Sequence, residues 1–148
     1  MNKPEPNTIY KLSNNHQYKT DELGRVSEAK GNLKLEKSDR NTYQQRMAGG
    51  ECRLETDCGG HLLASMFGGA GEGLNLVAMD GMLNGVKGKW YQMEMQWKRA
   101  LEKGQKVEVS IKPIYDGNGK RPHEFSIEQN INGIIQPRQI IKNTAAGE

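Results

Sequence analysis

The chain is organised around a stretch that runs from Asp57 to Gly69 and reads Asp-Cys-Gly-Gly-His-Leu-Leu-Ala-Ser-Met-Phe-Gly-Gly. It places His61 between two glycine pairs, with a carboxylate and a thiol just before the first pair. Glycine lets the backbone approach a ligand closely, and an imidazole that titrates near neutral pH can accept a proton. Two interpretations follow from these residues alone: a compact catalytic turn, or a glycine-rich loop that carries a hydrogen-bonded histidine.

Composition indicates one polar domain with long loops. The chain has 148 residues, of which 34% are hydrophobic and 6% aromatic, and 18 are glycine. This length suits a single domain with its own core, and the glycines argue against a helical bundle. The net charge of +3 permits a phosphate-bearing partner, whereas a dedicated duplex binder usually has a denser basic face. No apolar run reaches transmembrane length and the start lacks a signal-peptide segment, so we expect no membrane partner.

The first part of the chain shows few apolar residues. We expect residues 1–24 to be a loosely held lead-in, with a flexible segment over 1–17, a domain over 18–143 and a frayed tail over 144–148. Period-two alternation around a Gly-Asn pair predicts two short strands within 25–35.

Two further features lie between that region and the glycine pairs. A short helix is predicted over 39–47, capped by a serine or aspartate and ended by glycines. Cys52 and Cys58 lie six residues apart and form no metal motif, and we favour free thiols over a small disulfide loop. His16 and His123 have no catalytic context and are expected at the surface.

The clearest regular element is a helix from about Lys89 to Glu102. Its apolar face carries Trp90, Met93, Trp97 and Leu101 at helical spacing, and Glu94 falls on the same face. A buried carboxylate costs several kcal/mol unless it is paired or bonded. Glu94 therefore either has a basic, hydrogen-bonding or metal-linked partner, or extends from the helix edge to water.

The remainder of the chain is predicted to form three to four antiparallel strands. Alternating residues over 107–111 and 125–127 indicate strands, and 116–119 is a strong turn signal. Asn132-Gly133 predicts a tight hairpin turn.

Three polar residues in the central segment carry a family resemblance: His61, then Asn84 in Met-Leu-Asn, then Glu94 four residues after Trp90. Their order resembles the DNA/RNA non-specific endonucleases, in which a ββα-metal site has a general-base histidine, a metal-binding asparagine and a Trp-x-x-x-Glu sequence. The run Asp-x-Gly-Gly-His-Leu-Leu-Ala-Ser-x-Phe-Gly-Gly and the late Arg121-Pro122 resemble nuclease toxin domains at the C-termini of bacterial polymorphic toxins. The resemblance spans about residues 18 to 143 and implies a mixed α+β fold, an antiparallel sheet with a ββα-metal (His-Me finger) nuclease core.

The resemblance implies a role for each of these residues. His61 would be the general base that takes a proton from the attacking water. Asn84 would ligate a single Mg²⁺ or another divalent cation through its amide oxygen, and Glu94 would hold the waters of that metal. Asn75 is a candidate for orienting His61 or its loop.

One part of the family motif differs in this chain. Where the general family has Asp-Arg-Gly-His, this chain reads Cys58-Gly59-Gly60-His61, so the arginine that would contact phosphate is absent. Of the arginines at positions 40, 46 and 53, Arg53 is favoured for that contact because it lies just before the motif. Whether Asp57 substitutes for the motif aspartate stays open at this point.

By the same resemblance, the domain would hydrolyse phosphodiester bonds of DNA, and of RNA in the alternative, without sequence preference. It would be secreted or delivered as part of a larger toxin, by type VII or contact-dependent systems, act in the target-cell cytoplasm and be neutralised by a cognate immunity protein. Two rivals remain: a catalytically decayed nucleic-acid-binding or protein-interaction module, and a hydrolase that uses Cys52 or Cys58 as nucleophile with His61 as base.

Overall fold

The computed structural model describes residues 4–36, 54, 56–71 and 73–148. The predicted helix over 39–47, Cys52, Arg53 and the other two arginines of that region lie outside the described residues. In chain order the elements are β1 (Ile9–Lys11), β2 (Gln17–Thr20), β3 (Val26–Asn32), β4 (Asp57–His61), the 3-10 helix η2 (Gly73–Asn75), β5 (Leu76–Asp80), α2 (Lys89–Glu102), β6 (Val107–Tyr115), β7 (Pro122–Ile131), β8 (Ile134–Ile135) and β9 (Gln139–Lys142).

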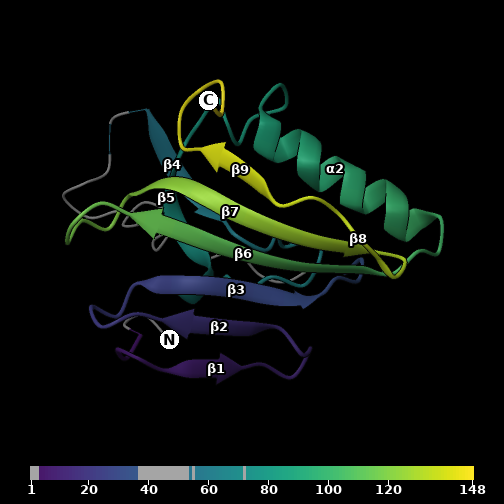
Figure 1. Ribbon diagram of the computed structural model, residues 1–148, viewed down its shortest axis with the longest axis horizontal. Coiled ribbons are helices and arrows are strands. Elements are labelled where there is room, and N and C mark those ends of the chain that lie inside the picture. The colour runs from purple at the N-terminus through teal and green to yellow at the C-terminus, as the bar shows by residue number, and fades with distance from the viewer. Residues whose placement is uncertain (1–3, 37–53, 55, 72) are drawn as a thin grey trace.

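Seven of these strands form one antiparallel sheet in the order β1-β2-β3-β6-β7, with β8 and β9 both paired to β7. Figure 1 shows them as successive rows, with β1 at the bottom and β9 at the top. The three to four strands expected after residue 107 are β6 to β9, and the N-terminal strands extend their sheet.

The remaining two strands form a separate hairpin. β4 pairs antiparallel with β5, from Asp57 opposite Asp80 to His61 opposite Leu76. In Figure 1 this pair lies behind the large sheet, and α2, which follows it in the chain, is seen at the upper right, beyond β9. The antiparallel α+β class with a ββα unit is therefore confirmed.

Side chains of the sheet, the hairpin and α2 share one core. From α2 come Trp90, Met93 and Trp97, each at most 3% exposed. The Trp90 ring packs 4.8 Å from that of Phe125 on β7, which joins the helix to the large sheet. The predicted helix bounds are confirmed at both ends. The apolar spacing also identified the face that packs on the core.

The lead-in differs from expectation. Residues in 1–24 form β1 and β2, and Tyr18 on β2 is fully buried. His16, expected at the surface, is only 2% exposed, whereas His123 is half-buried beside Asp116 and Glu124. Short strands dominated by polar residues carry a weak apolar signal, and pairing within the sheet buries them regardless.

The two strands expected over 25–35 are one strand. β3 runs from Val26 to Asn32 without a turn at Gly31-Asn32 and pairs with β6 along its second half. Gly31 serves a different purpose, because a Cβ there would meet Cδ2 of His16 at 2.5 Å. The glycine permits a buried imidazole to pack on the strand.

The C-terminal region follows its turn signals. Asn132 and Gly133 have φ values of 54° and 86°, as a tight hairpin turn between β7 and β8 requires. Residues 144–148, expected to fray, form a turn in which the Lys142 amide donates to Gly147 O at 3.0 Å. Lys89 also pairs with Glu148. The domain bounds themselves stay predictions. None of the helices in the described part of the chain has the length and apolar character needed to span a membrane.

Candidate active site

A cavity of about 350 Å³ opens where the β4–β5 hairpin meets α2. Its lining brings together three residues that the sequence analysis selected, His61, Asn84 and Glu94. The other lining residues are Ala64, Ser65, Met66, Tyr91 and Met95. Three different elements, a strand end, a loop and a helix, thus contribute polar groups to one concave site.

His61 is the last residue of β4 and is 6% exposed. Its backbone lies opposite Leu76 of β5, and the next residue, Leu62, donates its amide to Asn75 O at 2.9 Å. Gly60 next to it makes this pairing possible, because a Cβ there would lie 2.8 Å from Cβ of Met79. The strand register therefore sets the position of the imidazole at the cavity.

Asn75 organises the loop that follows His61. Its Oδ1 accepts from the Leu63 amide at 2.8 Å, and its Nδ2 donates to Leu63 O at 2.7 Å and to Ala70 O at 2.8 Å. The side chain is fully buried and does not line the cavity. These bonds hold the path of the chain just after His61, as a loop-orienting residue would.

Asn84 lies in the loop between β5 and α2. Its amide donates to Asp80 O at 3.1 Å, and Oδ1 of Asp80 accepts from the amides of Met82 and Leu83 at 2.9 and 3.2 Å. Leu83 is fully buried and anchors the loop. The Asn84 side chain is half-buried, and its Nδ2 donates to Sγ of Cys58 at 3.5 Å.

Glu94 lies on the second turn of α2 and is 7% exposed. It therefore does not extend to water from the helix edge. It faces the same cavity as the Asn84 amide, so two oxygen donors, one carboxylate and one amide, converge there. This donor set suits Mg²⁺, which prefers oxygen ligands, binds through one or two side chains and keeps several waters.

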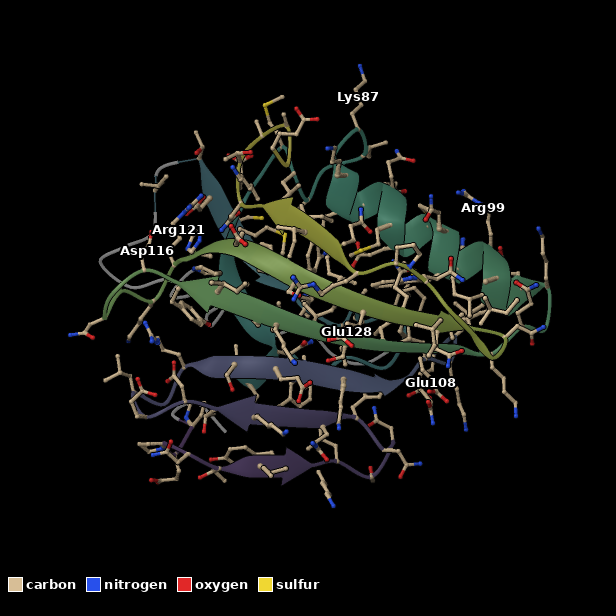
Figure 2. All side chains as sticks on the ribbon, in the orientation of Figure 1. Lys87, Arg99, Glu108, Asp116, Arg121 and Glu128 are labelled. Carbon is tan, nitrogen blue, oxygen red and sulfur yellow. The ribbon has the colours of Figure 1, made fainter. Side chains whose placement is uncertain are left out.

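Asp57 does not substitute in the cavity. It begins β4, about 13 Å along the strand from His61 at the usual rise per residue. Its side chain is fully buried and paired with Arg121, with Nε of Arg121 2.7 Å from Oδ2. Arg121 thus belongs to the link between β4 and the large sheet. Figure 2 shows it where β7 begins, on the side of the molecule where β4 starts.

Two cavity residues on α2 were not predicted from the sequence. Tyr91 and Met95 line the cavity, Tyr91 three residues before Glu94 and Met95 four residues after Tyr91, so each follows its neighbour along the helix surface. Helical spacing from Glu94 identifies Tyr91, and the same spacing from Tyr91 identifies Met95. Ser65 and Met66 come from the loop that Asn75 organises, and no local pattern marks them.

A hairpin with a histidine at the end of its first strand, followed by a helix that carries a carboxylate into the same cavity, defines the class of ββα-metal nucleases. The sequence model of the DNA/RNA non-specific endonuclease family matches residues 6–133. The chain belongs to this family.

Curated relatives agree with that assignment. The chain is 41% identical over 144 residues to the type VII secretion system protein EssD of Staphylococcus aureus strain USA300, and equally to that of strain NCTC 8325. The match covers 94% of this chain and 24% of each relative, so the chain spans about a quarter of their length.

Solved structures show the same fold. NucA from Streptococcus agalactiae with magnesium bound superimposes with a TM-score of 0.71 at 18% identity, covering 95% of this chain and 77% of that one. An extracellular endonuclease superimposes with a TM-score of 0.55 at 22% identity, covering 93% and 83%. At these identities the likeness concerns the fold.

Proposed function

We propose that this chain is a divalent-metal-dependent endonuclease that hydrolyses DNA without sequence preference and acts as an antibacterial toxin domain. One observation carries the proposal: His61, Asn84 and Glu94 line a single cavity although 33 positions of chain separate the first from the last. A proton acceptor and two oxygen donors at one site are the groups that phosphodiester hydrolysis needs.

His61 acts as the general base. A neutral imidazole near pH 7 takes a proton from a water that attacks the phosphorus in line with the leaving oxygen. The residue is mostly buried at the end of a paired strand, so its ring is held in place before substrate arrives. Such preorganisation lowers the entropic cost of bringing the base to the attacking water.

Asn84 and Glu94 hold the metal. Asn84 supplies its amide oxygen, and Glu94 accepts hydrogen bonds from waters of the bound ion. A bound Mg²⁺ supplies positive charge that stabilises the oxygens of the reacting phosphate. The magnesium in the structurally similar NucA supports the choice of metal.

Basic residues would bind the phosphate backbone of the substrate. Arg53 remains our candidate for the contact that the family motif assigns to arginine. Lys98 lies four residues after Glu94 and so follows it on the same face of α2. Lys87 and Arg99 are exposed and point outward in Figure 2, one from the loop before α2 and one from the helix. Contacts of this kind carry no base information, as expected for cutting without sequence preference.

The toxin role rests on the relatives. They are named as type VII secretion proteins, and this chain corresponds to about a quarter of their length. We infer that the domain is delivered as part of a larger secreted toxin, acts in the target-cell cytoplasm and is neutralised by a cognate immunity protein. The test is whether a small acidic protein encoded by the neighbouring reading frame co-purifies with it and stops its activity.

Nuclease activity is tested with supercoiled plasmid and Mg²⁺. The wild type should convert it to nicked and linear forms, and EDTA or His61→Ala should prevent this. Circular dichroism and thermal melting show whether the variant is folded. Supercoiled DNA that persists with wild-type protein and Mg²⁺ or Mn²⁺ overturns the enzyme proposal and favours the decayed binding module.

The thiol nucleophile has less support. Of the described residues, eight line the cavity with His61 among them, and Cys58 is not one of them. Its Sγ instead contacts Asn84. A thiol hydrolase would need Cys58 within hydrogen-bond reach of the base. The thiol-hydrolase alternative predicts that Cys58→Ser abolishes activity and that EDTA does not. A metal nuclease should instead be inhibited by EDTA and keep activity in Cys58→Ser.

A further inference from the structure

Cys58 occupies the position where the family motif carries aspartate, and the structure gives it a specific contact. It lies in β4 opposite Met79 of β5, carries a free thiol and is half-buried. Its Sγ accepts a hydrogen bond from Nδ2 of Asn84 at 3.5 Å. The thiol therefore contacts the side chain that we propose as the metal ligand.

The Asn84 backbone is fixed independently of this contact. The backbone N–H of Asn84 donates to Asp80 O, and the backbone N–H groups of Met82 and Leu83 donate to the Asp80 carboxylate. Among the described residues, the contact with Cys58 is the one hydrogen bond that the Asn84 side-chain amide makes. What the thiol determines is thus the orientation of the amide, rather than the position of the loop.

An amide group has a donor end and an acceptor end, so binding one end orients the other. Because Nδ2 is directed to sulfur, Oδ1 points away from Cys58, and Asn84 lines the cavity in which a cation would bind. A flipped amide would present its N–H groups to the metal site, and these cannot act as ligands of a cation. The orientation decides whether Asn84 is a ligand at all.

We propose that Cys58 is a positioning residue that holds the amide of Asn84 with its oxygen toward the metal site. This rests on the proposed function, in which Asn84 binds the metal. Sulfur is a weak acceptor, and a hydroxyl or carboxylate can take its place. The requirement at position 58 is therefore an acceptor, which both cysteine and the aspartate of the family motif provide.

The test compares variants that differ in the acceptor and are matched in size. Cys58→Ser and Cys58→Ala form the small pair, and Cys58→Asp and Cys58→Val the larger pair. Mn²⁺ binding is measured without DNA, by calorimetry or by the electron paramagnetic resonance of the free ion. We expect Ala and Val to raise the dissociation constant about tenfold, and Ser and Asp to stay near wild type.

A merely structural role would not separate the members of each pair in this way. Equal Mn²⁺ affinity for Ser and Ala, or for Asp and Val, overturns the proposal even if the wild type is an active metal nuclease. If an apolar variant fails to fold, a crystal structure of the wild-type protein with Mn²⁺ provides the test instead. Asn84 Oδ1 on the ion with Nδ2 facing Sγ supports the proposal, and any other amide orientation overturns it. A wild type that neither binds Mn²⁺ nor cleaves DNA would instead contradict the proposed function.

Discussion

Arg121 donates two hydrogen bonds to the Asp57 carboxylate, with Nε 2.7 Å from Oδ2 and Nη2 3.2 Å from Oδ1. The same Nη2 donates to Asn143 O, and the Asn143 side chain donates to Ala78 O and Pro122 O. The ion pair thus joins the start of β4 to the large sheet, at the end of the strand opposite His61. The position of the base at one end of β4 depends on this attachment at the other.

Replacing Arg121 with methionine should destabilise the fold strongly. The Asp57 side chain is fully buried and that of Arg121 is 15% exposed, so the substitution removes the Arg121 charge from a buried carboxylate. Such losses cost about 3–5 kcal/mol. Urea unfolding measures the effect, with Lys112→Met, which removes an exposed ion pair with Glu128 on the large sheet, as the comparison that should stay near wild type. Equal unfolding midpoints for Arg121→Met and wild type would contradict the role given to this pair.

The sequence predicted what local signals specify. Helical spacing fixed the bounds of α2, and Asn132-Gly133 specified its turn because few other residues adopt positive φ. It could not predict the Arg121–Asp57 pair, whose members lie 64 positions apart. Nor could it foresee the burial of Tyr18 on β2 and of His16 just before it, since no apolar pattern marks this segment.

The same limit applies to the site. His61, Asn84 and Glu94 were found through their order in the chain, which the family resemblance supplied. The functions of Asn75 and Cys58 depend on which backbone or side chain the fold brings to them. No spacing in the sequence indicates that Cys58 meets Asn84, because the contact follows from the β4–β5 register and the return of the loop after Asp80.

Replacing Asn75 with aspartate should impair both stability and activity. The carboxylate keeps an acceptor for the Leu63 amide but has no N–H for Leu63 O and Ala70 O. Buried acceptors left unpaired cost about 1–3 kcal/mol each, and the loop after His61 loses its anchor. Thermal melting and plasmid nicking measure the two effects. Asn14→Asp is the control, because Asn14 donates a single bond to Gly68 O in a less buried setting. A variant with a lowered melting temperature but normal nicking would show that the loop does not position His61.

Buried His16 should make the protein less stable in mild acid. Burial lowers the pKa of His16 below its ordinary value of 6.5, although Glu36 and a backbone hydrogen bond with Asn32 act in the opposite direction. The unfolded chain therefore binds the proton more readily than the folded one. The stability contribution of neutral His16 is complete above pH 6.5 and is lost as the pH falls from there toward the folded-state pKa.

Urea unfolding of wild type and His16→Gln at a series of pH values measures this linkage. The free-energy difference between the two proteins should favour wild type more at pH 7.5 than at pH values of about 5. The other two histidines are present in both proteins, so their titration cancels in the difference. A difference that stays constant with pH would mean that His16 titrates alike in both states.

Glu94→Gln should reduce the affinity for metal while leaving the helix intact. Glutamine keeps the shape of the side chain and removes the charge that would hold the waters of the ion. Loss of such an outer contact weakens metal binding or activity about 10- to 100-fold. The nicking rate should therefore recover in part at high Mg²⁺. Glu102→Gln on the exposed side of the same helix is the control and should behave as wild type. A Glu94→Gln protein with wild-type Mg²⁺ dependence would place this carboxylate outside the metal site, because a group that binds the waters of the ion must alter its affinity when the charge is removed.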